Sequence, residues 1–131
     1  MSDSAELPLF ASPISAGFPS PADDYMEKKL DLNEHLVGNR QATFCLPVSG
    51  DSMIGAGIHN GDLLIVDKSI PAVHKKIVVA VVDGELVVKR LLYANQKVFL
   101  AAENPNYAQI EVTEEQEFAV WGVVTKVIHE V

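Results

Sequence analysis

The chain has 131 residues, of which 48% are hydrophobic and 21% charged, and its formal net charge is −8 at pH 7. This length and composition suit one globular domain with a core of its own. The acidic balance argues against unaided binding to the phosphate backbone of DNA, because that binding depends on Lys and Arg. We therefore expect no direct sequence-specific DNA binding, and a protein as the partner.

The first residues are expected to form an extended arm. Residues 1–24 hold four of the seven prolines with scattered Ser and Ala, a composition that does not favour a regular element. The start of the chain has neither the positive charge nor the apolar run of a secretory signal, and no later apolar stretch is long enough to span a membrane. These features predict a cytoplasmic protein with no membrane association.

Two short helices are predicted next. Pro21-Ala22-Asp23-Asp24, capped by Ser20, resembles a helix start and favours a helix over residues 25–30. Asp31, with Glu34 three positions later, predicts a second helix over residues 31–37. We divide the chain into an N-terminal arm with short helical segments, residues 1–39, and a domain of residues 40–131.

From residue 41 onward the pattern changes to strands. Asp83-Gly84, between two apolar runs, is a strong hairpin signal. Short strands with few helices predict a mainly β domain of the partly closed barrel kind. The expected strands are rich in Val, Ile and Leu and are separated by turn signals; they cover residues 43–48, 62–67, 76–82, 85–92, 97–101 and 118–128.

Three side chains in these strands are expected to be buried. Cys45 lies between Phe44 and Leu46 and is interpreted as a buried structural thiol. As the single cysteine it cannot form an internal disulfide, which favours a reducing compartment. Phe118 and Trp121, in the last apolar strand, are expected in the core.

Ser52 and Lys89 are the candidate catalytic residues. Ser52 follows Gly50 in a turn of small residues, and a serine becomes a nucleophile only when a nearby base takes its proton. Lys89 lies in an apolar strand, where burial can lower the pKa of a lysine until it acts as that base. Taken singly, Ser52 is explained as a turn residue and Lys89 as a lysine that reaches water.

Ala16 and Gly17 resemble a bond that such a pair could cut. Their small side chains suit a narrow cleft and let the backbone approach a nucleophile. Ser52 lies 36 positions (52 − 16) after Ala16, and an extended chain spans about 3.3 Å per residue, so reach is not limiting. The arm could enter its own active site or that of a second copy.

The order of these motifs resembles the UmuD family, self-cleaving accessory subunits of error-prone translesion polymerases and relatives of the LexA repressor. The spacing from Ser52 to Lys89, 37 positions (89 − 52), also fits the family. A cut at Ala-Gly resembles LexA-like repressors, whereas some UmuD proteins have Cys-Gly. The resemblance covers nearly the whole chain and rests on Ala16-Gly17-Phe18-Pro19, Ser49-Gly50-Asp51-Ser52-Met53, Asn60-Gly61-Asp62-Leu63 and Val88-Lys89-Arg90-Leu91.

The resemblance implies a β-rich LexA-type Ser–Lys peptidase domain with Ser52 as nucleophile and Lys89 as general base. It implies an SOS-response homodimer that cuts its own Ala16–Gly17 bond when stimulated by the RecA filament on single-stranded DNA. The shortened form would then act with a UmuC-like Y-family polymerase in mutagenic translesion synthesis. Since only 16 residues precede the bond, we expect no DNA-binding helix-turn-helix domain and therefore no LexA-type repressor.

Other interpretations remain open. The chain could be a non-cleaving dimeric scaffold that regulates a polymerase, or a peptidase that acts on other proteins. A Ser–His–Asp triad with His59 or His74 is conceivable, although nothing favours it over Lys89. No metal site and no cofactor are predicted, because the four histidines share no metal-ligand spacing with each other or with the cysteine; they are His35, His59, His74 and His129.

Overall fold

A computed structural model describes residues 6–10, 13–14, 16–17 and 26–131. The chain divides into two compact units, residues 1–38 and residues 39–131. No helix in the described part of the chain is long and apolar enough to cross a membrane.

The first unit contains a two-stranded antiparallel sheet, β1 (Glu6–Phe10) paired with β2 (Met26–Asp31). The prediction that residues 1–24 form no regular element is therefore wrong for β1. It failed because a strand in a two-stranded sheet has a free edge, where a proline such as Pro8 is tolerated. The helix predicted over residues 25–30 is wrong for residues 26–30, since pairing with β1 overrides local helix propensity. Its predicted cap, Ser20, lies outside the described residues.

The second predicted helix is confirmed as α1 (Leu32–Leu36). Asp31 is its N-cap, and the Asp31 side chain accepts a hydrogen bond from the Asn33 N–H at 2.9 Å. This bond satisfies one of the donors that a helix leaves free at its start.

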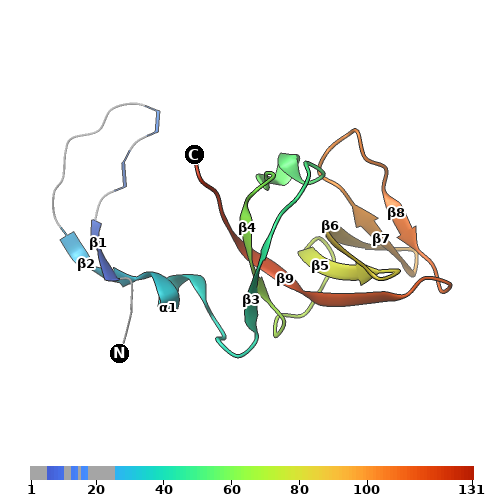
Figure 1. Ribbon diagram of the computed structural model, residues 1–131, viewed down its shortest axis with the longest axis horizontal. Coiled ribbons are helices and arrows are strands. Elements are labelled where there is room, and N and C mark those ends of the chain that lie inside the picture. The colour runs from blue at the N-terminus through green and yellow to red at the C-terminus, as the bar shows by residue number, and fades with distance from the viewer. Residues whose placement is uncertain (1–5, 11–12, 15, 18–25) are drawn as a thin grey trace. The chain divides into compact units, whose positions relative to one another are not determined.

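The second unit is built on a seven-stranded antiparallel sheet with the strand order β3-β4-β9-β5-β6-β7-β8. All six strands predicted here are confirmed, and the short β8 is an addition. Figure 1 shows β9 crossing the unit between the part that holds β3 and β4 and the part that holds β5 to β8. The strands are β3 (Thr43–Pro47), β4 (Leu63–Asp67), β5 (Ile77–Val82), β6 (Glu85–Ala94), β7 (Lys97–Ala101), β8 (Ile110–Val112) and β9 (Phe118–Ile128).

The hairpin between β5 and β6 turns at Asp83 and Gly84, as predicted. Both residues have positive φ, 49° and 82°, which is the backbone of a two-residue turn that matches the twist of the flanking strands. This hairpin fixes β6 in register with β5, so that Lys89 lies opposite Val78.

Buried side chains form two hydrophobic clusters, and β5 contributes to both. Val79 belongs to the first cluster and Val78 and Ala80 to the second, so both faces of β5 are covered. This explains why β5 is apolar throughout instead of alternating. The first cluster contains Met53, Ile58, Leu64, Val66 and Val79, and the second contains Val78, Ala80, Leu91, Leu100 and Val123.

Two of the three side chains expected to be buried are not. Trp121 is 40% exposed because it lies at a β-bulge: its neighbours Val120 and Gly122 pair with Ala80 and Val79, which leaves Trp121 without a partner on β5. Cys45 is exposed, since alternation along β3 turns its flanking residues toward the first cluster and Cys45 away from it. Phe118 is half-buried against the second cluster.

Candidate active site

Ser52 lies in the loop between β3 and β4. Gly50 has a φ of +96°, a conformation that favours glycine, and its N–H donates to Asn60 Oδ1 at 2.8 Å. Directly after Ser52, Met53 is 1% exposed and belongs to the first hydrophobic cluster. Ile54, which begins the short 3-10 helix Ile54–Ala56, is exposed. Ser52 is therefore held between a hydrogen-bonded turn and a buried anchor.

A second loop braces the backbone around Ser52. The Glu103 N–H donates to the Ser52 carbonyl at 2.9 Å, and the Glu103 carbonyl accepts from the Gly55 N–H at 2.7 Å. Asn104 adds a side-chain bond from Nδ2 to the Asp51 carbonyl at 2.9 Å. A Cβ at Gly55 would lie 2.6 Å from the Glu103 carbonyl oxygen, so this contact requires glycine.

Lys89 lies on β6, half-buried opposite the fully buried Val78. Burial lowers the pKa of the Lys89 amine, because a charged ammonium is less favourable away from water. The Lys89 Nζ lies 5.3 Å from the centroid of the Tyr107 ring, a distance at which the protonated form gains a cation–π contact. This contact opposes the effect of burial, but burial outweighs it, so the pKa of the amine is lowered overall.

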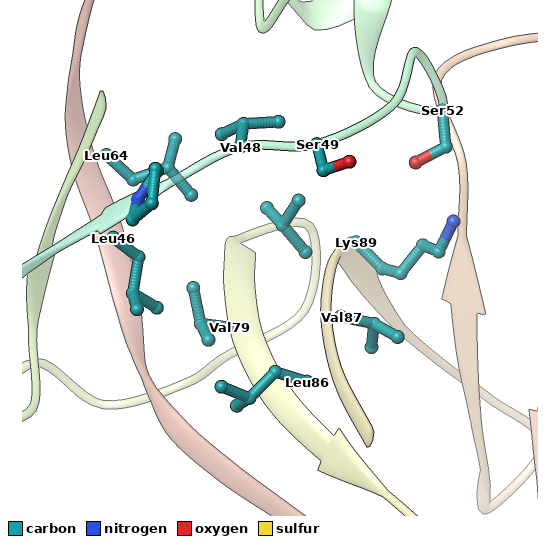
Figure 2. A pocket seen from close by; sticks show the side chains of 11 residues that line it. Leu46, Val48, Ser49, Ser52, Leu64, Val79, Leu86, Val87 and Lys89 are labelled. Atoms are coloured by element: carbon teal, nitrogen blue, oxygen red, sulfur yellow. The ribbon is translucent and has the colours of Figure 1, made fainter. Parts of the chain in front are cut away.

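Ser52 and Lys89 line the same pocket. Figure 2 shows the Ser52 hydroxyl and the Lys89 amine pointing toward one another at one end of it, with apolar side chains such as Leu46 and Val79 at the other end. The pocket thus combines a hydroxyl, an amine of lowered pKa and an apolar wall. This arrangement can activate a nucleophile and seat an apolar chain segment next to it.

Arg90 links the strand of Lys89 to the loop that braces Ser52. Its guanidinium pairs with the Glu103 carboxylate, and its Nη1 donates to the Lys75 carbonyl at 2.6 Å. Because the Glu103 backbone also bonds to Ser52, a short chain of contacts connects the two candidate residues. Sequence reasoning missed Arg90 and Glu103 in this role; their charges were visible, but the 13 positions between them carry no local signal.

Tyr107 is a further residue that sequence reasoning missed. Its hydroxyl donates to Asp51 Oδ1 at 2.7 Å, and this bond raises the pKa of Tyr107, because ionisation would remove the donated proton next to a carboxylate. Tyr107 thus contacts the residue before Ser52 with its hydroxyl and faces Lys89 with its ring. The residues before it, Asn104-Pro105-Asn106, have turn-forming composition and indicate only that a loop lies here.

Comparison with known proteins identifies the family of this chain. A family model described as Peptidase S24-like matches residues 8–125. This chain belongs to the Peptidase S24-like family. Its mainly β structure agrees with the fold of LexA and UmuD-like members, and the family includes self-cleaving serine peptidases.

Individual relatives match over most of the chain. Protein ImpA of Salmonella typhimurium is 44% identical over 128 residues, which are 97% of this chain and 86% of ImpA. Protein MucA of Escherichia coli is 42% identical over 120 residues, 91% of this chain and 82% of MucA. The LexA repressor of Syntrophotalea carbinolica is 40% identical over 123 residues, 94% of this chain and 59% of the repressor. ImpA and MucA are UmuD-family proteins, so the resemblance seen in the sequence is confirmed.

The other residues singled out in the sequence of this S24-like chain belong to different segments. Ala16 and Gly17 are exposed and belong to the first unit. His59 lies beside Asp62, and the His74 Nδ1 accepts a hydrogen bond from the Tyr93 N–H at 2.9 Å. His74 is thus hydrogen-bonded to another part of the chain, and neither histidine lines the pocket of Ser52 and Lys89.

Proposed function

We propose that this protein is a Ser–Lys autopeptidase of the UmuD type that cuts its own Ala16–Gly17 bond. The observation that carries the proposal is the shared pocket, in which the Ser52 hydroxyl faces a lysine whose pKa is lowered by burial. A buried lysine near a serine hydroxyl is the pairing that Ser–Lys catalysis needs.

The residues support a two-step reaction. Neutral Lys89 takes the proton of the Ser52 hydroxyl, and the Ser52 oxygen attacks the Ala16 carbonyl carbon. As the Ala16–Gly17 bond breaks, protonated Lys89 donates its proton to the Gly17 nitrogen, which leaves as an amine. Water, deprotonated by Lys89, then attacks the ester between Ala16 and Ser52 and releases the free serine.

The bond itself suits such a pocket. Ala16 and Gly17 are exposed, and a Cβ built at Gly17 would meet no described atom within 4 Å. The lack of a side chain at Gly17 lets the scissile peptide approach a nucleophile closely. The apolar wall of the pocket suits the uncharged residues around the bond.

Membership of the family supports a proposal for the cellular role. We infer that cleavage belongs to the SOS response, that the RecA filament on single-stranded DNA stimulates it, and that the protein is a cytoplasmic homodimer. The shortened form would act with a UmuC-like Y-family polymerase in mutagenic translesion synthesis. The net charge of −8 supports action through protein partners without direct sequence-specific DNA binding.

Intact mass tests the proposal directly. The purified chain is incubated at about pH 10, where more lysine is neutral, and separately with RecA filaments at neutral pH. We expect a fragment that begins at Gly17, and none from Ser52→Ala or Lys89→Ala. A wild-type chain that stays intact under both conditions would leave the non-cleaving dimeric scaffold as the better explanation.

A further inference from the structure

Two histidines and an aspartate meet on the second unit, and none of them lines the pocket of the proposed dyad. His59 and Asp62 lie in the loop before β4, and His129 follows the end of β9. We propose that these three side chains form a binding site for a divalent transition-metal ion of the Zn²⁺ class.

The distances fit a compact site. The His129 Nδ1 lies 2.5 Å from Asp62 Oδ1, the His59 Nδ1 lies 3.6 Å from Asp62 Oδ2, and one ligand atom from each residue falls within 4.8 Å of the other two. Donor atoms around a tetrahedral Zn²⁺, each about 2.0–2.1 Å from the ion, lie about 3.3 Å apart. Small side-chain rotations, with release to solvent of the Nδ1 proton that His129 shares with Asp62, would bring the three donors to binding distance.

The two imidazole rings already face the Asp62 carboxylate. The centroids of His59 and His129 are 4.7 Å apart, and both rings present Nδ1 to the Asp62 carboxylate. The His59 Nδ1 is buried and makes no hydrogen bond to any described residue. A buried nitrogen without a partner next to a carboxylate is the kind of group that a metal ion satisfies.

Burial separates the roles of the ligands. The Asp62 side chain is 2% exposed, whereas those of His59 and His129 are 43% and 45% exposed. The Asp62 carboxylate accepts hydrogen bonds from the His59 N–H at 2.7 Å and from the His129 ring at 2.5 Å, which hold it between the two histidines. The exposed rings leave one side open for water as a fourth ligand.

The donor set selects the ion. Two imidazole nitrogens with one carboxylate are typical of Zn²⁺ and its neighbours, whereas Mg²⁺ and Ca²⁺ prefer oxygen ligands throughout. We therefore expect Zn²⁺ to bind and Mg²⁺ not to compete.

The site would also support the loop that carries Ser52. The Asp62 carbonyl accepts from the Val48 N–H at 2.8 Å, and Asn60 in the same turn holds Gly50. A metal ion would join this turn to the end of β9 and stabilise the folded state by mass action.

The test uses the full chain after removal of metal by a chelator. Calorimetric titration with ZnCl₂ should give one ion per chain, no effect of MgCl₂, and a rise of Tm when Zn²⁺ is added. His59→Gln should weaken binding at least about tenfold, because losing even an outer partner of a metal ligand costs about 10- to 100-fold in affinity. His35→Gln is the matched control, since His35 is exposed on α1, and should bind like the wild type.

His59→Gln is the deciding variant. The His59 side chain makes no hydrogen bond to the described residues, so this variant should fold like the wild type, whereas His129→Gln also removes a hydrogen bond. Loss of Zn²⁺ binding in folded His59→Gln supports the site. Unchanged binding in His59→Gln, or no binding by the wild type, overturns it.

Discussion

The pocket of Lys89 and the turn of Asp62 each bury an ionisable side chain, but the first favours the neutral form and the second the charged form. At Lys89, burial alone shifts the pKa, and it favours the neutral amine. At Asp62, burial also disfavours the charge, but hydrogen bonds from the His59 N–H and His129 reverse the outcome and lower the pKa. Both regions bury a titratable side chain, but the Asp62 charge is hydrogen-bonded, whereas the Lys89 charge has only the weaker contact with the Tyr107 ring.

This difference separates a reactive group from a structural one. A charge that is fully hydrogen-bonded stabilises the fold, whereas a charge that is buried without compensation is destabilising and is ready to lose its proton. Among the residues that the structure describes, no carboxylate lies within ion-pair distance of Lys89. The Lys89 pocket is therefore suited to proton transfer and the Asp62 turn to holding the chain.

The largest expected effect is the loss of cleavage when Lys89 is replaced. Lys89→Arg keeps a long cation but stays protonated, so cleavage should fall by at least about 10²-fold. In the wild type, the cleavage rate should rise with pH and level off as Lys89 becomes neutral, with a midpoint below the ordinary lysine pKa of about 10.4, because burial lowers the pKa. Rates from intact mass between pH 6 and 11 measure both.

Lys97→Arg is the matched control for this profile, because Lys97 is an exposed lysine on β7 that pairs with Glu111. Its profile should follow the wild type. A wild-type rate that does not change with pH, or full activity in Lys89→Arg, would contradict the role of Lys89 as the base.

The second effect is a loss of stability when Asp62, whose charge is hydrogen-bonded, is replaced. Asp62→Ala leaves the His59 N–H without its 2.7 Å acceptor and should lower Tm at pH 7 by roughly 4–8 °C. Since the folded pKa of Asp62 is lowered, its stabilisation is present above the unfolded pKa of about 3.9 and is lost as pH falls through the folded pKa. The difference in Tm between wild type and variant should therefore shrink below about pH 4, as calorimetry would measure. An equal Tm at pH 7 would show that the contacts of Asp62 contribute nothing.

The smallest expected effect is a gain of stability when Lys89 is replaced by an apolar residue. Lys89→Met should raise Tm by a few degrees at neutral pH, because an apolar side chain of similar length replaces a charge whose burial outweighs its contact with the Tyr107 ring. The pKa of Lys89 is lower in the folded chain than in the unfolded chain, so at pH values between the two the unfolded chain binds more protons. The destabilisation by Lys89 is therefore complete below its folded pKa and disappears as the pH rises toward about 10.4.

The Lys89→Met measurement belongs in a Ser52→Ala background, where cleavage cannot interfere at alkaline pH. The gain in Tm should be present at pH 7 and absent above about pH 10.5. A loss of Tm at pH 7 would mean that Lys89 is compensated after all, and the contrast with Asp62 would disappear.

Most of the second unit was predictable because its signals are local. Apolar runs and the Asp83-Gly84 turn predicted β5 and β6, and the order of Ser52 and Lys89 predicted the candidate pair. The failures were non-local. Residues 26–30 have helix-forming composition but pair with β1, and Trp121 looks like a core residue but lies at a bulge. Neither a partner strand nor a bulge leaves a mark in the segment itself.

Residue type, order and spacing were enough to predict the family, the β-rich character and the candidate pair. The tertiary structure decided what surrounds each group. It brought Glu103 beside Ser52, and His129 beside Asp62 at a separation of 67 positions. Burial and hydrogen bonding depend on such distant neighbours, so whether a buried charge is compensated is decided only when the chain folds.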